Sequence, residues 1–167
     1  IVNMEEIAEQ SYDLMEAYML AQEKANEKLQ QASEKQNEMQ KKFAAKNNIT
    51  LIESESASEA KMKIASAVMK HYDEVYLIFF KSYKQEAYLM DAVNQKKVNS
   101  IEQNVNSLQS FSEQGLEKLK DLTGYNNDAS LIIACRNLLN FYKDEAKKGS
   151  AMTDFFLKAE NFAKLKK

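Results

Sequence analysis

The sequence predicts an all-α fold: an elongated, antiparallel, up-down-up-down four-helix bundle that spans residues 1–167 as a single domain. Apolar residues recur at alternating spacings of four and three over residues 4–43, as on one face of a long helix. The chain has no proline and only three glycines, so it lacks the turn residues on which sheets, barrels and α/β folds depend. Shorter apolar stripes with helical spacing follow, and these supply the partners that a long helix needs.

The first predicted helix runs from near residue 2 to Lys46, and its apolar seam extends over roughly 60 Å at about 1.5 Å per residue. The seam positions are Met4, Ala8, Ser11, Met15, Tyr18, Gln22, Ala25, Leu29, Ala32, Gln36, Met39 and Phe43. We expect the three polar seam residues to fix the packing register rather than to bind a ligand. Residues 47–58 then form the clearest loop, because they are rich in Asn, Ser and Glu.

The second predicted helix begins at a capping serine, Ser56 or Ser58, and meets no breaker before the polar residues 94–97. Asn99 followed by Glu102 forms a capping box that predicts the start of a third helix. Residues 122–124 predict its end, with Gly124 as the left-handed residue.

The fourth predicted helix begins at Asn127 or Asp128, and its apolar phase continues through Gly149 without a slip. This phase favours a continuous or kinked helix, whereas residues 147–150 also resemble a helix stop followed by a new cap. A straight helix would extend beyond the bundle and expose Phe155, Phe156 and Phe162, whose burial stabilises by about 2–3 kcal/mol each. We therefore expect either a bend or break near Gly149, or a boundary between helices two and three at residues 84–88. The earlier boundary is preferred because it also explains the unbroken phase.

The charge pattern supports this topology and excludes some partners. Residues 1–20 carry five acidic and no basic side chains, and four lysines lie within the last ten residues, so antiparallel first and last helices would place opposite charges together. The net charge of −2 predicts no strong attraction to nucleic acid. The longest apolar runs, residues 75–80 and 131–135, are far shorter than the ~20 residues of a membrane span.

No set of residues in the sequence predicts catalysis, a metal or a cofactor. A single histidine, His71, excludes the usual dinuclear metal site of four-helix bundles, which needs two Glu-x-x-His motifs. Cys135 lies in an apolar run, and the sequence offers it no activating base, so we interpret it as a core residue. We therefore expect a protein that is not an enzyme.

Aromatic residues offer the best candidates for ligand or partner binding. His71 on the inner stripe could act as a base oriented by Glu74 or as a pH-sensitive group, or it could be a core histidine hydrogen-bonded across the bundle. The aromatic residues could equally be bundle core, or they could form an exposed groove or dimer face. The candidate binding residues are His71, Tyr72, Tyr76, Phe80, Tyr83 and Phe155.

Residues 138–143 (Leu-Leu-Asn-Phe-Tyr-Lys) and 154–162 (Asp-Phe-Phe-Leu-Lys-Ala-Glu-Asn-Phe) resemble the end of certain uncharacterised helical proteins that bacteria export or anchor to lipid at the cell surface. The resemblance implies a location in the periplasm or at the cell surface, with a lipid anchor possible upstream of residue 1. It supplies no catalytic residues. The chain begins with Ile rather than Met, which agrees with the removal of a signal peptide.

Three functions are compatible with these patterns. The first is a non-enzymatic, extracytoplasmic bundle, monomeric or homodimeric, that binds a protein partner or belongs to the cell envelope. The second is a cytoplasmic adaptor or scaffold that self-associates through its long apolar stripes. The third is a carrier that holds a small ligand in a cavity near His71.

Overall fold

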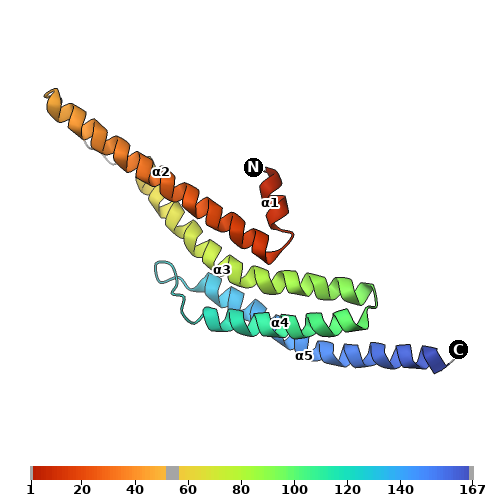
Figure 1. The fold of residues 1–167 in the computed structure, drawn as a ribbon. Coiled ribbons are helices and arrows are strands. Elements are labelled where there is room, and N and C mark those ends of the chain that lie inside the picture. The colour runs from red at the N-terminus through yellow and green to blue at the C-terminus, as the bar shows by residue number, and fades with distance from the viewer. Residues whose placement is uncertain (1, 52–56, 166–167) are drawn as a thin grey trace. The chain divides into compact units, whose positions relative to one another are not determined.

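The computed structural model describes residues 2–51 and 57–165, and over these residues the protein is all-α, as predicted (Figure 1). Its helices are α1 (Val2–Ala8), α2 (Tyr12–Lys46), α3 (Ala57–Asn94), α4 (Val98–Lys118) and α5 (Ser130–Leu165). The chain divides into two compact units, Ile1–Met69 and Lys70–Lys167, whose boundary falls inside α3. The four-helix up-down-up-down arrangement is not confirmed, and the single-domain organisation stays a prediction.

In the first unit, the predicted long helix is interrupted. α1 ends at Ala8 and packs on α2, which begins at Tyr12 with Ser11 as its N-cap. The backbone N–H of Leu14 donates to Ser11 Oγ at 3.3 Å, so this hydroxyl competes with the helical backbone bonds that a continuous helix would require. The prediction that residues 2–46 form one helix is therefore wrong at Ser11, whereas the predicted end at Lys46 is confirmed.

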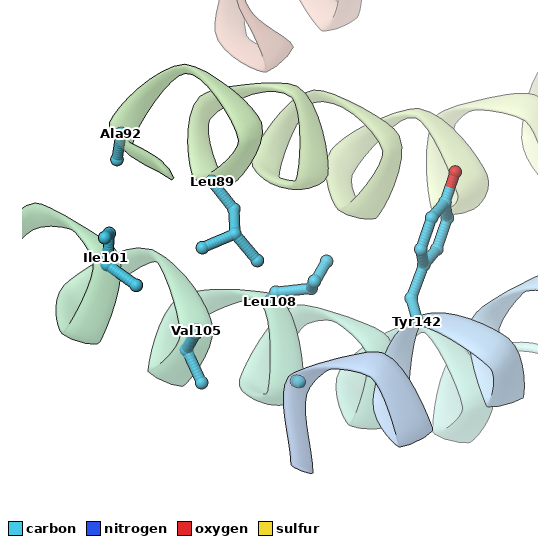
Figure 2. Packing of buried hydrophobic residues seen from close by; sticks show 7 residues of the cluster. Leu89, Ala92, Ile101, Val105, Leu108 and Tyr142 are labelled. Carbon is cyan, nitrogen blue, oxygen red and sulfur yellow. The ribbon is translucent and has the colours of Figure 1, made fainter. Parts of the chain in front are cut away.

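In the second unit, residues 70–94 of α3 pack with α4 and α5 as three successive antiparallel helices (Figure 1). Buried residues from all three helices meet in one cluster, and six of them are labelled in Figure 2: Leu89, Ala92, Ile101, Val105, Leu108 and Tyr142. A second cluster consists of Val75, Leu119, Ile132, Cys135 and Leu139. The partly buried Phe79 packs against both clusters, so they are neighbours along the helices of this unit.

The boundary between α3 and α4 lies at residues 95–97, in the polar run that the sequence indicates. The preferred alternative at residues 84–88 is wrong, because α3 continues through these residues and Gln85 Nε2 donates to Asn104 Oδ1 of α4 at 2.7 Å. The capping box at Asn99 is also wrong. α4 begins at Val98, and its N-cap Lys97 makes no side-chain capping bond to the described residues.

The connection between α4 and α5 differs from its prediction. α4 ends at Lys118, before the expected stop at residues 122–124, and the left-handed residues are Asn126 (φ 49°) and Asn127 (φ 66°) rather than Gly124. A Cβ on Gly124 would lie 2.4 Å from the carbonyl oxygen of Asp128, so this glycine permits a close approach of two backbone segments. Asp128 Oδ1 accepts a bond from the N–H of Ser130 at 2.8 Å, and α5 begins there, slightly later than predicted.

α5 continues through Gly149, so the continuous-helix prediction is confirmed and the predicted stop at residues 147–150 is wrong. Ser150 does not cap a new helix, since its hydroxyl donates to the carbonyl of Lys147 within α5. Phe156 packs against the core, but Phe155 is 66% exposed and Phe162 is 62% exposed. α5 thus forms without burial of Phe155 and Phe162, and the expectation that both rings require a packing partner within the chain is wrong.

Candidate functional site

Five of the six candidate binding residues lie on α3, and four of them form one aromatic row along it. Tyr72 stacks on Tyr76 with 5.6 Å between ring centroids, and Tyr76 lies 5.6 Å from Phe80. The row continues to Tyr83, whose ring centroid lies 6.2 Å from that of Phe80. His71 precedes the row and lies 6.4 Å from Tyr125 of the loop after α4. The spacing of these residues on one helix is what made the row visible in the sequence.

The members of the row differ in exposure. Phe80 is 1% exposed and belongs to the core, so it can support a surface but cannot itself contact a partner. Tyr72 and Tyr83 are exposed, which leaves their ring edges and hydroxyl groups at the surface. Phe155 lies outside the row, on α5, where its ring centroid is 5.7 Å from that of Phe156.

His71 has a local environment that the sequence did not reveal. Its Nε2 atom is buried with no hydrogen-bond partner among the described residues, and Glu74, its predicted orienting group, is exposed. The bonds from Ser130, and more weakly the charge of His71, lower the pKa of the Asp128 carboxyl. His71, Tyr125 and Asp128 are thus neighbours, although Asp128 is committed to capping α5.

A second polar cluster joins α3 and α5. Burial, and then repulsion from Glu86, raise the pKa of Glu145, whose Oε2 atom is buried without a partner among the described residues. Burial also raises the pKa of Tyr142 to about 12, with smaller contributions from Glu86, Glu145 and Tyr83. The negative charges of Glu86 and Glu145 thus repel each other beside the buried phenol of Tyr142. Among the described residues, no group of three His, Cys, Asp or Glu side chains could hold a metal ion.

Replacing Glu145 by glutamine is expected to stabilise the second unit at neutral pH by about 0.5 kcal/mol, a value that allows for solvent screening. A raised pKa means that the folded state binds the proton more tightly than the unfolded state. The contribution of Glu145 is therefore full below an ordinary glutamate pKa of about 4.3 and is lost as the pH rises through its folded value. Urea denaturation at neutral and at acidic pH should show the gain at neutral pH only.

Glu113→Gln is the matched control for that measurement. Glu113 Oε1 lies 3.5 Å from Lys143 Nζ, so its charge is attracted rather than repelled. We expect no gain in stability from this change at any pH. An equal gain from Glu113→Gln, or a gain from Glu145→Gln that persists in acid, would contradict the assignment of repulsion to Glu145.

α2 presents a different kind of candidate surface. Of its 35 residues only Met15 and Ala44 are buried, and every residue from 20 to 43 is exposed. The predicted seam therefore lies open over its second half, with Leu29 at 68% and Phe43 at 63% exposure. The sequence predicted which face of this helix is apolar but not that the face would be uncovered.

A groove of about 690 Å³ lies along the last turns of α2. Its lining residues are Ala32, Lys35, Gln36, Met39, Gln40, Phe43 and Ala44 of α2, with Ile49 and Leu51 of the segment that follows. Lys35 is the one charged residue among these described lining residues. Such a shallow, mostly apolar surface beside a helix suits another helix better than a small polar substrate.

No protein-family model matches this chain, and no curated protein or solved structure matches it at a significant level. None of the helices formed by residues 2–51 and 57–165 combines the length and apolar character needed to cross a bilayer. The candidate function therefore depends on the surfaces described above.

Proposed function

We propose that the chain is a non-enzymatic, partner-binding helical protein that acts in the periplasm or at the cell surface, with α2 as its binding element. The observation that carries the proposal is the run of exposed residues from 20 to 43, which includes the apolar residues of a regular helical seam. Contiguous exposed apolar surface of this kind is typical of interaction sites.

The energetics of α2 support the same proposal. Most helices in proteins gain their stability from packing an amphipathic face, because intrinsic helix propensity alone is marginal in water. α2 packs very few of its residues within the described chain. A partner helix that covers Leu29, Met39 and Phe43 would supply about 1.5–3 kcal/mol for each fully buried side chain.

The extracytoplasmic location is supported by the resemblance of residues 138–143 and 154–162 to exported bacterial surface proteins. Two rival arrangements concern the same apolar stripe. A self-associating scaffold would cover the stripe with a second copy, and the predicted four-helix bundle would cover it with the chain's own helices. Light scattering at several concentrations tests the scaffold, because an obligate scaffold cannot remain a monomer.

One experiment tests both the location and the binding element. We expect Ser33→Cys, expressed from its own gene in the native cell, to react in intact cells with a membrane-impermeant maleimide that carries a benzophenone. Illumination should then cross-link it to another protein. Ser33 is exposed beside the seam, whereas Cys135 is buried and burial raises the pKa of its thiol to about 11, so the natural cysteine contributes little background.

Asn106→Cys is the control, because this residue is exposed on α4 in the other unit. It should be labelled in intact cells and give no cross-link. Labelling of Ser33→Cys only after lysis would contradict the location. Labelling without a cross-link to another protein would contradict partner binding through α2.

A further inference from the structure

We infer that the partner element of α2 is an amphipathic helix with an acidic flank, a conclusion that rests on the proposed function and specifies its partner. The apolar stripe supports a helix because Ala25, Leu29, Ala32, Met39 and Phe43 keep the alternating spacing of a coiled-coil seam. The alanines allow two helices to approach closely. The groove bounded by Met39, Phe43 and Leu51 can receive a larger apolar side chain at one end of the stripe.

The charges that border the stripe differ between its two flanks. Three lysines follow one flank at a spacing of seven residues, which returns to the same side of a helix: Lys28, Lys35 and Lys42. The other flank carries uncharged residues at the same spacing: Asn26, Ser33 and Gln40. The positions that face away from the stripe carry both signs, with glutamates such as Glu27 and Glu34 and lysines such as Lys24 and Lys41. A partner helix on the stripe thus meets a positive edge and no negative one.

This asymmetry favours an acidic partner over a second copy of the chain. Two antiparallel copies would place their lysine flanks against each other, which costs energy. Two parallel copies would pair each lysine flank with an uncharged flank and would set Gln22 against Gln22 and Gln36 against Gln36 in the seam. Only a helix with carboxylates along the matching edge satisfies the lysines and covers the apolar stripe together.

A pair of synthetic peptides tests this inference on the full chain. Both are amphipathic helices of about three heptads with leucine at the seam positions, and their flanking positions are glutamate in one and lysine in the other. Fluorescence anisotropy should show that the glutamate peptide binds about tenfold more tightly than the lysine peptide, because several charge pairs act together. The preference should decrease at high ionic strength.

Charge reversal on the protein should invert this preference. The variant Lys28→Glu/Lys35→Glu/Lys42→Glu is expected to bind the lysine peptide more tightly than the glutamate peptide. The control variant Lys148→Glu/Lys158→Glu/Lys164→Glu makes the same change in net charge at exposed positions of α5 and should keep the original preference. Circular dichroism checks that both variants retain their helices.

Each other outcome overturns the inference. Equal binding of both peptides, binding of neither, or blockage of the site by self-association would exclude an acidic helix as the occupant. If the chain binds anionic phosphatidylglycerol vesicles through the stripe and does not bind the glutamate peptide, the stripe would be assigned to a membrane surface. A cross-link from Ser33→Cys without a preference between peptides would overturn this inference alone, whereas the absence of a cross-link would overturn the proposed function.

Discussion

Replacing Phe80 by alanine is expected to lower the free energy of unfolding of the second unit by about 3–5 kcal/mol. Phe80 is 1% exposed, and its ring centroid lies 5.6 Å from that of Tyr76 and 6.2 Å from that of Tyr83. Removal of the ring therefore leaves a cavity and breaks two aromatic contacts. A loss of this size is a large part of the stability of a small unit. Urea denaturation followed by circular dichroism measures it.

Phe155→Ala is the matched control because it deletes the same ring from a position that is 66% exposed. We expect a change within about 0.5 kcal/mol for this variant. Both residues are candidates for partner binding from the sequence, and the two variants separate a core role from a surface role. A similar loss from both replacements would show that Phe155 is buried in solution or that Phe80 is not.

Apolar periodicity predicted most of the helices because each carries an apolar stripe, which α3, α4 and α5 bury in the core and α2 leaves exposed. The polar residues 94–97 indicated the break between α3 and α4, although the preferred boundary at residues 84–88 was wrong. The continuity of α5 was indicated by its unbroken phase through Gly149. The break at Ser11 was missed because serine suits both a polar seam position and an N-cap, and spacing alone does not distinguish them. Competition between backbone and side-chain bonds decided the outcome at that residue.

The candidate sites divide into features that lie on one helix, which the sequence predicts, and features that depend on how helices pack, which it does not. The aromatic row along α3 was predictable because its members lie on one helix, at spacings that bring them together. The electrostatic repulsion between Glu86 and Glu145 was not predictable, because it depends on how α3 and α5 pair. The lysine flank of α2, Lys28, Lys35 and Lys42, was present in the sequence as a seven-residue repeat. Its significance depended on the finding that the adjacent stripe is exposed.

Gly115 of α4 packs closely against side chains of both α3 and α5. A Cβ added to Gly115 would lie 2.8 Å from Leu139 Cδ1 of α5 and 3.2 Å from Ile78 Cγ2 of α3. Leu139 itself is 0% exposed. We expect Leu139→Ala to cost about 3 kcal/mol, because it leaves a cavity at a site where three helices meet.

Gly115→Ala should have opposite effects in the two backgrounds. In the natural chain, crowding against Leu139 costs about 1–3 kcal/mol and exceeds the ~1 kcal/mol that alanine gains over glycine in a helix. In the Leu139→Ala background the nearest obstacle is gone, so the new methyl group partly fills the cavity and should restore about 1 kcal/mol. A double-mutant cycle in urea should therefore give a coupling energy above about 1 kcal/mol.

Gly149→Ala provides the control for this cycle. Its added Cβ would meet Val105 Cγ2 at 2.8 Å, and Leu139 is not among the neighbours that it would meet. Its effect on stability should therefore be the same in the natural chain and in the Leu139→Ala background, within about 0.5 kcal/mol. Additivity of Gly115→Ala with Leu139→Ala would contradict the proposed close contact, since the cost of the methyl group would then arise elsewhere. Coupling at Gly115 but not at Gly149 would confirm that Leu139 is the neighbour that an added methyl group meets at Gly115.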